Sequence, residues 1–490
     1  MQHFKALAKH STIFSAAAFI KKGVGFIMIP VYTRFLMPED YGLLELLDLT
    51  ISVIAMIFGM RIGAGIIRFY HSYEEMHDKK EVYSTALITM TLIALVLLAV
   101  LQIFSHPIAN LIAGSAEQVR AFQVMFGCLA LQQIFMTGES YLLAQKKSVL
   151  YSTLSLISFV IMLSLNILFL VFMGLGVYGI LLSMLIAKAL NMVLVLGITL
   201  RGVPLKFSWS KLRVMTLYTL PLVPAGAAMF LLHFSDRFFI RQFVDLSELG
   251  LYALGYKFGM LISIFITAPI FSIWDTQRYE IAKQPDAGPV FARTFTWFVF
   301  VLVLAGLGIT LFIDEVLHLV ATERYDGAST VVPLIALAYI VFSMAGFLNL
   351  GNMITGRTKY IMYIQVFVAT LNILFNISLI SRFGIMGAAA STLLSFSILM
   401  VLNYYASQKA LYVPFEYRRV VVLFAIGGVL FTVSRLVDGH LALVLAAKLV
   451  LLAAYPTLLL LARFFSQDEI NAGKGLLRGV MNRMPFGARS

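Results

Sequence analysis

The sequence predicts an all-α integral membrane protein with about fourteen transmembrane helices, arranged as two pseudo-symmetric six-helix bundles followed by two extra C-terminal helices. Hydrophobic residues make up 60% of the 490 residues, whereas soluble proteins contain about 45–50%. Apolar runs of about 18–25 residues recur along the chain, and each can cross a hydrocarbon core of about 30 Å as a helix. One polar hairpin between two such runs occurs twice in the sequence. These observations exclude a soluble globular protein.

The predicted helices follow one another through short loops. The first apolar run comes after two lysines, as in a signal peptide, but it is too long for a cleaved segment, so we expect an uncleaved first span. The predicted spans are 11–33, 42–67, 83–104, 119–142, 149–173, 176–199, 215–236, 250–274, 291–313, 328–350, 360–381, 385–407, 419–436 and 441–463.

The duplicated hairpin occupies residues 35–46 and 243–254. When Phe35 is aligned with Phe243, an acidic residue and a following Gly-Leu pair coincide without a gap. The same register holds farther along the chain and aligns two glycines of each half: Gly176 and Gly179 with Gly384 and Gly387. Repetition over about half the chain is typical of transporters built from two homologous bundles.

Each half contains six predicted spans, so both halves start on the same side of the membrane and the repeat is parallel. We expect an N-terminal bundle at 1–200, a basic cytoplasmic linker at 201–213 and a C-terminal bundle at 214–410. Helices thirteen and fourteen at 411–463 follow, and a basic cytoplasmic tail at 464–490 ends the chain.

The basic residues predict the orientation in the membrane. The formal net charge is +13, but the lysines and arginines concentrate in loops, and most fall on one side if the N-terminus is cytoplasmic. This bias follows the positive-inside rule. We therefore expect both termini in the cytoplasm, and no nucleic-acid partner.

Two lysines lie near the middle of the first span. A lysine at the bilayer centre costs about 2.5–3.5 kcal/mol, so Lys21 and Lys22 need a polar environment. Lys22 shares a helix stripe with small and polar residues such as Ser15 and Gly25. The stripe suits the wall of a water-filled cavity. The alternative is structural pairing with an acidic residue of the second span.

The second span carries a continuous small-and-polar face at helical spacing. Its members are Glu45, Asp48, Ser52, Ala55, Gly59 and Gly63. Arg61 stands near the inner end of the same span. It is predicted either to line the cavity or to anchor the helix at the interface.

The second bundle also carries polar residues and prolines inside its spans. Pro221 and Pro224 free backbone carbonyls and bend the seventh span, so we expect a hinge or gate there. Asp236 and Arg237 form either a local ion pair at the outer interface or part of an outer gate. Lys257 is embedded in the eighth span.

Lysine and arginine therefore dominate the predicted membrane interior, which also holds the embedded Lys188. A cavity lined mainly by cations attracts an anion, and pyrophosphate suits lysine and arginine especially well. The main embedded acids are Glu45, Asp48 and Asp236. They are predicted either to carry a coupling ion or to act as counter-charges.

The sequence resembles the Wzx-type polysaccharide flippases. The resemblance rests on the hairpin Arg34-Phe-Leu-Met-Pro-Glu-Asp-Tyr-Gly-Leu, the stretch from Asp236-Arg237 to Tyr252 and the paired glycines. These flippases belong to the multidrug/oligosaccharidyl-lipid/polysaccharide (MOP) exporter superfamily. The resemblance implies a central cavity that opens alternately to each side. It also implies export of an undecaprenyl-diphosphate-linked oligosaccharide for O-antigen, capsule or exopolysaccharide synthesis, with proton or sodium coupling.

The resemblance extends to the lipid II flippases, which carry cationic residues in their first, second and eighth helices. It implies that the diphosphate contacts Lys21 or Lys22, Arg61 and Lys257. The expected partners are the lipid-linked oligosaccharide and membrane lipids, with a polysaccharide polymerase and chain-length proteins as further candidates. We expect a monomer.

Two other functions compete with a flippase. A multidrug antiporter of the same superfamily would need deep acidic residues for cationic drugs, whereas the deep charges here are mainly basic. A membrane-embedded polymerase or ligase would need positioned carboxylates on a sizeable loop, and every predicted loop is short. No phosphate-binding loop appears, the histidines are scattered and Cys128 is the single cysteine. We therefore predict no enzyme, catalytic residue, metal or cofactor.

Overall fold

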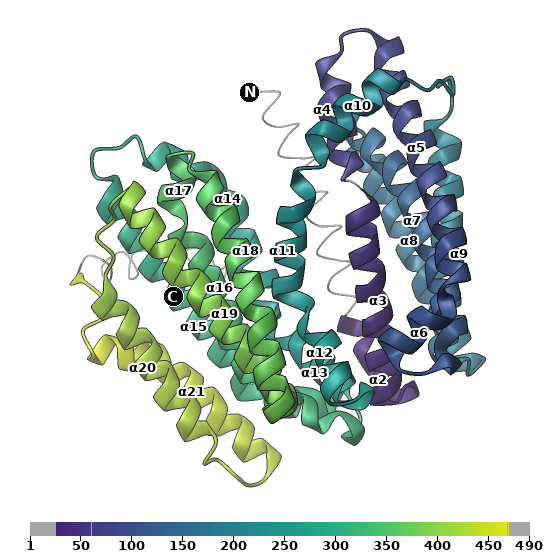
Figure 1. Ribbon diagram of the computed structural model, residues 1–490. Helices are drawn as coiled ribbons and strands as arrows, with labels where there is room; N and C mark the ends of the chain where they lie inside the picture. The colour runs from purple at the N-terminus through teal and green to yellow at the C-terminus, as the bar shows by residue number, and fades with distance from the viewer. Residues whose placement is uncertain (1–25, 60, 468, 470–490) are drawn as a thin grey trace, which may run out of the picture. The chain divides into compact units, whose positions relative to one another are not determined.

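The computed structural model describes residues 26–59, 61–467 and 469 (Figure 1). Lys21, Lys22, most of the predicted first span and nearly all of the predicted tail therefore lie outside the described residues. Within the described part every regular element is a helix, and 11 helices are long and apolar enough to cross a membrane. The predicted all-α membrane fold is confirmed.

The first half of the chain contains ten described helical elements in sequence. They are α2 (Ile29–Phe35), α3 (Pro38–Phe58), α4 (Ile62–Ser72), α5 (Met76–Ile103), α6 (Ser105–Ala113), η1 (Ala116–Gln118), α7 (Val119–Ala144), α8 (Ser148–Asn166), η2 (Ile167–Phe172) and α9 (Gly176–Thr199). Helix α7 packs against α4, α5 and α9, and α8 packs against α9. A buried stack of Tyr83 on Tyr141, with ring centroids 4.0 Å apart, joins α5 to α7.

The second half of the chain contains fifteen described helical elements. They are α10 (Trp209–Thr219), α11 (Leu222–Phe234), α12 (Asp236–Phe243), α13 (Leu246–Gly259), η3 (Ile262–Thr267), α14 (Ala268–Ile281), α15 (Ala287–Val320), η4 (Glu323–Val331), α16 (Val332–Leu348), α17 (Leu350–Ile354), α18 (Thr358–Phe375), η5 (Asn376–Ile380), α19 (Ser381–Ala410), α20 (Tyr417–Ser434) and α21 (Leu441–Leu461).

The difference between fourteen predicted spans and the 11 found has three causes. The first span lies mostly outside the described residues. The seventh is interrupted at Pro221, between α10 and α11, because proline lacks the backbone N–H that a continuous helix needs. The eleventh and twelfth form one helical segment, 358–410, which bends at Gly384, where φ is 56° and ψ is −136°.

The second predicted span, 42–67, is not continuous either. Helix α3 ends at Phe58 and α4 begins at Ile62. Arg61 lies in the left-handed region with φ of 48°, a conformation that costs a non-glycine residue of order 1–3 kcal/mol. Hydropathy alone does not detect this break, because the residues on both sides of it are apolar.

Positions that correspond in the sequence repeat share local geometry. Gly176 and Gly384 both have positive φ, 55° and 56°. Three residues later, Gly179 and Gly387 each lie so close to the preceding helical segment that a Cβ would crowd it. The preceding segment is a π-helical turn in both halves, η2 and η5. The two halves therefore repeat one local structure at these glycines.

The chain divides into two compact units. The first comprises Met1–Gly255, Leu317–Val331 and Met362–Ser395. The second comprises Tyr256–Val316, Val332–Ile361 and Phe396–Ser490.

Candidate functional site

A polar cavity of about 350 Å³ lies inside the first unit. The broken helix α3–α4 forms one wall and α7 forms the other. Most of the small-and-polar face predicted for the second span lines it. The lining residues are Asp48, Ile51, Ser52, Ala55, Met56, Gly59, Arg61, Ile62, Gly63, Gln132, Gln133, Met136 and Ser140. We call this space the front cavity.

Arg61 reaches the front cavity because the helix breaks beside it. Its guanidinium lies against α11, where a Cβ on Gly226 would overlap Nη2 and lie 3.0 Å from Cζ. Helices α3 and α11 pack side by side in the first unit (Figure 1). The glycine at 226 leaves the space that the guanidinium occupies, and the structure thus places Arg61 in the cavity wall.

A second polar cavity of about 360 Å³ lies between α7, α8 and α9. Its polar lining consists of Gln132, Glu139, Tyr151, Ser155, Ser158, Lys188 and Asn191. It shares Gln132 and Met136 with the front cavity. We call it the rear cavity.

Gln132, which lines both cavities, is hydrogen-bonded to Lys188 of the rear cavity. The Lys188 ammonium donates a hydrogen bond to Oε1 of Gln132. The neighbouring Gln133 donates from Nε2 to the backbone carbonyl of Ala55, 3.3 Å away. Neither glutamine was predicted from the sequence as a site residue. Their signal was present, since two adjacent amides inside an apolar span need polar partners.

Arg237 forms a buried ion-pair group with two acids of the first unit. Arg237 is 1% exposed and Asp236 is 3% exposed. Arg237 Nη1 lies 2.7 Å from Asp236 Oδ1, and Arg237 Nε lies 3.6 Å from Glu45 Oε1. Nη1 also donates to the carbonyl of His233 at 2.9 Å. Glu45 from the first repeat and Asp236 from the second thus act on one cation.

The other oxygen of Asp236 faces hydroxyl groups. Tyr252 and, at 3.5 Å, Thr392 donate hydrogen bonds to Oδ2. An amide and hydroxyl network lies in the same region, with Ser235 and Asn376 both donating to Oδ1 of Asn372 at 3.0 and 3.1 Å. These donors hold the Asp236 carboxylate in one orientation.

The remaining predicted residues lie in different places. Pro221 is the residue before α11, and Pro224 lies in that helix's first turn. Both belong to the first unit, where α10 packs on α4 and α11 packs on α3. Lys257 is half-buried in α13 and belongs to the second unit.

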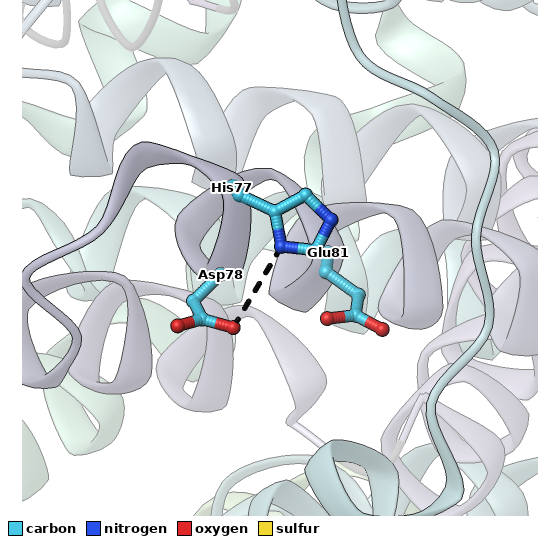
Figure 2. A group of neighbouring side chains, drawn as sticks. All are labelled: His77, Asp78 and Glu81. Carbon is cyan, nitrogen blue, oxygen red and sulfur yellow. Dashed lines mark ion pairs between the residues drawn. The ribbon is translucent and has the colours of Figure 1, made fainter.

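A cluster of His77, Asp78 and Glu81 brings potential metal-ligand atoms within 4.8 Å of one another (Figure 2). Lys211 already bridges its carboxylates, with Nζ 2.7 Å from Asp78 Oδ1 and a further ion pair to Glu81. Burial opposes the charge on Lys211, but hydrogen bonds to the two carboxylates raise the pKa of Lys211 above its usual value. These ion pairs from Lys211 to Asp78 and Glu81 connect the linker 201–213 to α5.

A helical membrane protein with charged and amide side chains inside its bundle belongs, by architecture, to the transporter class. The chain belongs to the polysaccharide biosynthesis protein family, whose sequence pattern matches residues 7–274. This confirms the family predicted from the duplicated hairpin.

Two relatives carry names that refer to glycan or polysaccharide biosynthesis. The probable low-salt glycan biosynthesis flippase Agl15 of Haloferax volcanii is 26% identical over 208 residues, covering 40% of this chain and 43% of the relative. The succinoglycan biosynthesis transport protein ExoT of Rhizobium meliloti is 21% identical over 255 residues, covering 51% and 49%. The matched regions thus span less than half of each relative.

Solved structures share the fold over nearly the whole chain. The lipid II flippase MurJ, in an inward closed conformation, matches with a TM-score of 0.76 and 13% identity, covering 91% of this chain and 98% of MurJ. An inward-facing multidrug resistance MATE transporter of the MOP superfamily matches with a TM-score of 0.63 and 13% identity, covering 81% and 94%. The chain therefore shares the fold of these two transporters.

Proposed function

We propose that this protein is a flippase that moves an undecaprenyl-diphosphate-linked oligosaccharide across the cytoplasmic membrane by alternating access. The observation that carries the proposal is a polar cavity inside the membrane bundle, with a guanidinium held in its wall by a helix break. Polar and charged side chains inside a membrane bundle cost free energy and add no stability to it. Their presence around this cavity therefore favours a functional role for the cavity. The family and the glycan-related names of two relatives support a glycan as cargo.

Arg61 is proposed to bind the diphosphate. Its planar guanidinium offers paired N–H donors that match phosphate oxygens, and its left-handed backbone aims it into the front cavity. Lys21, Lys22 and Lys257 are proposed as further point charges for the same group. Cations that neutralise the diphosphate allow the sugar to cross in water while the lipid tail stays in the bilayer.

Asp48 is the proposed carrier of a coupling proton or sodium ion. It lines the front cavity. Glu45 and Asp236 lie within ion-pair distance of Arg237. Glu45 and Asp236 are therefore assigned to balancing Arg237. Neutralising Asp48 as Asp48→Asn should then remove the pH or sodium dependence of transport, while Glu45→Gln should act mainly on stability.

Pro221 and Pro224 are proposed as the hinge of the seventh span. A helix that is already broken at Pro221 can bend there without losing a further backbone hydrogen bond. The protein is proposed to act as a monomer in a bacterial inner membrane, with both termini in the cytoplasm. Its proposed partners are membrane lipids, a polysaccharide polymerase and chain-length proteins.

Complementation tests the proposal in cells. A bacterium that lacks its own O-antigen or capsule flippase receives wild type, Arg61→Ala or the control Arg357→Ala, which removes an exposed arginine that does not line the front cavity. Wild type and the control should restore surface polymer, and Arg61→Ala should not. Cytoplasmic accumulation of lipid-linked repeat units with well-expressed wild type would contradict the proposal. Drug resistance in its place would favour a multidrug antiporter.

A further inference from the structure

We propose that the two cavities of the first unit together form a glycan-selecting subsite, in which Lys188 orients the amide of Gln132 toward the sugar. The proposal rests on the proposed flippase function and extends it from the diphosphate to the sugar. Three features carry it: the orientation of two amides, the mixed polar lining and the position of Gln132 in the lining of both cavities.

The orientation of Gln132 is fixed by its partner. An ammonium has donors only, so the atom that receives the hydrogen bond from Lys188 must be the carbonyl oxygen, Oε1. The amide nitrogen then points the other way, where its nearest protein partner is the thioether sulfur of Met136 at 4.0 Å. A thioether is a weak acceptor. Gln132 therefore presents N–H donors at the junction of the cavities.

Gln133 is oriented in the opposite sense. Its nitrogen donates to the carbonyl of Ala55, and its oxygen lies beside Gly59, 2.9 Å from where a Cβ on that glycine would be. Gln133 thus offers an acceptor in the front cavity. Adjacent residues on one helix therefore supply one donor amide and one acceptor amide.

The rest of the lining has the same mixed character. Hydroxyls of Ser52 and Ser140 line the front cavity, and those of Ser155 and Ser158 line the rear cavity. A sugar presents hydroxyl groups that both donate and accept, so it can pair with such a lining. A simple anion would be served by donors alone. Each cavity also lies within the range of about 300–1,000 Å³ that is usual for small-ligand sites.

The order of groups along the cavities matches the order of groups in the substrate. Arg61 lines the front cavity only, Gln132 stands at the junction, and Lys188 lines the rear cavity only. A diphosphate at Arg61 would place the attached sugar toward Gln132. A site whose amides need hydrogen-bond partners rejects a ligand that lacks them, because the amides are then left unpaired.

Gln132→Glu is the sharpest variant. A glutamate keeps the size of the side chain and an acceptor for Lys188, but it replaces the N–H donors with an oxygen. Gln145→Glu is the matched control, because Gln145 follows the end of the same helix and lines neither cavity. Lys188→Met removes the group that orients the amide.

The experiment titrates full-length protein in nanodiscs with two probes, undecaprenyl diphosphate and undecaprenyl-diphosphate N-acetylglucosamine. Wild type and Gln145→Glu should bind the glycosylated probe about ten-fold tighter than the bare one. Gln132→Glu and Lys188→Met should lose this preference and keep the affinity for the bare diphosphate. Arg61→Ala should bind both probes more weakly.

The outcomes separate the two proposals. Wild type that binds neither probe contradicts the flippase function itself. Wild type that binds both probes equally, or a Gln132→Glu protein that keeps the full preference, overturns the subsite and leaves the flippase function standing. Size-exclusion elution and thermal unfolding in detergent confirm that each variant is folded, and if Lys188→Met fails to fold, Gln132→Glu decides alone.

Discussion

Gly42 and Gly250, which are equivalent residues of the sequence repeat, lie against each other. A Cβ on Gly42 would overlap the carbonyl of Leu246 and lie 3.0 Å from the backbone nitrogen of Gly250. A Cβ on Gly250 would overlap the carbonyl of Pro38 and lie 3.1 Å from the nitrogen of Gly42. The contact is reciprocal, as expected where two copies of one element meet about a pseudo-two-fold axis. The duplicated hairpin packs against its own copy.

Gly42→Ala and Gly250→Ala should each destabilise the protein by about 1–3 kcal/mol, because the added methyl group must push two backbones apart. Thermal unfolding in detergent measures the effect. Gly197→Ala is the control, since a Cβ at Gly197 meets no atom within 4 Å. Equal unfolding temperatures for all three variants would show that the backbones are not in close contact.

Gly226→Val should impair transport through Arg61. The valine side chain would occupy the space of the guanidinium and turn it away from its present position. We expect weaker binding of undecaprenyl diphosphate in nanodiscs. The double variant Gly226→Val with Arg61→Ala should be no worse than Arg61→Ala alone. Additive losses would instead indicate that Gly226 acts independently of Arg61.

Arg237→Met should be strongly destabilising, by about 3–5 kcal/mol, because it leaves buried carboxylates without their cation. Adding Glu45→Gln removes one of those carboxylates and should recover part of the loss. The two unfolding temperatures measured in detergent test this coupling. An Arg237→Met protein as stable as wild type would mean that the acids are not held by the arginine.

Glu469 should make the end of the chain sensitive to acid. Burial alone would raise its pKa from 4.5, but the backbone N–H of Ser466 and the guanidinium groups of Arg293 and Arg419 lower the pKa of Glu469 to about 2. A depressed folded-state pKa adds stability above the unfolded value and loses it as the pH falls toward the folded value.

The difference in unfolding temperature between wild type and Glu469→Gln should therefore be full above about pH 4.5 and vanish toward about pH 2. Glu74→Gln changes an exposed glutamate and serves as the control. A difference that stays constant over this range would mean that the charge of Glu469 contributes nothing.

The sequence predicted the features that depend on hydropathy and on repetition. Apolar runs placed most of the helices, and alignment of the two halves identified Gly42 with Gly250 before their contact was known. The polar face from Asp48 to Gly63 was also predictable, because small and polar residues recur there at the period of an α-helix in the amino-acid sequence.

The rest depends on backbone geometry or on distant partners. The break at Arg61 is set by a left-handed φ that hydropathy cannot register. Which atom of Gln132 faces the cavity depends on Lys188, which is 56 residues away. Arg237 and Glu45 belong to opposite repeats and are far apart in the sequence. The sequence therefore indicates only the ion pair between Arg237 and the adjacent Asp236.

Translocation by purified protein shows whether the chain moves a lipid-linked oligosaccharide across a bilayer. Wild type, Arg61→Ala and Arg357→Ala are reconstituted into liposomes that carry a fluorescent undecaprenyl-diphosphate-linked oligosaccharide, and a membrane-impermeant quencher reports how much reaches the outer leaflet. We expect rapid redistribution with wild type and Arg357→Ala, and slow redistribution with Arg61→Ala. Redistribution by wild type no faster than in protein-free liposomes would contradict the proposed flippase function.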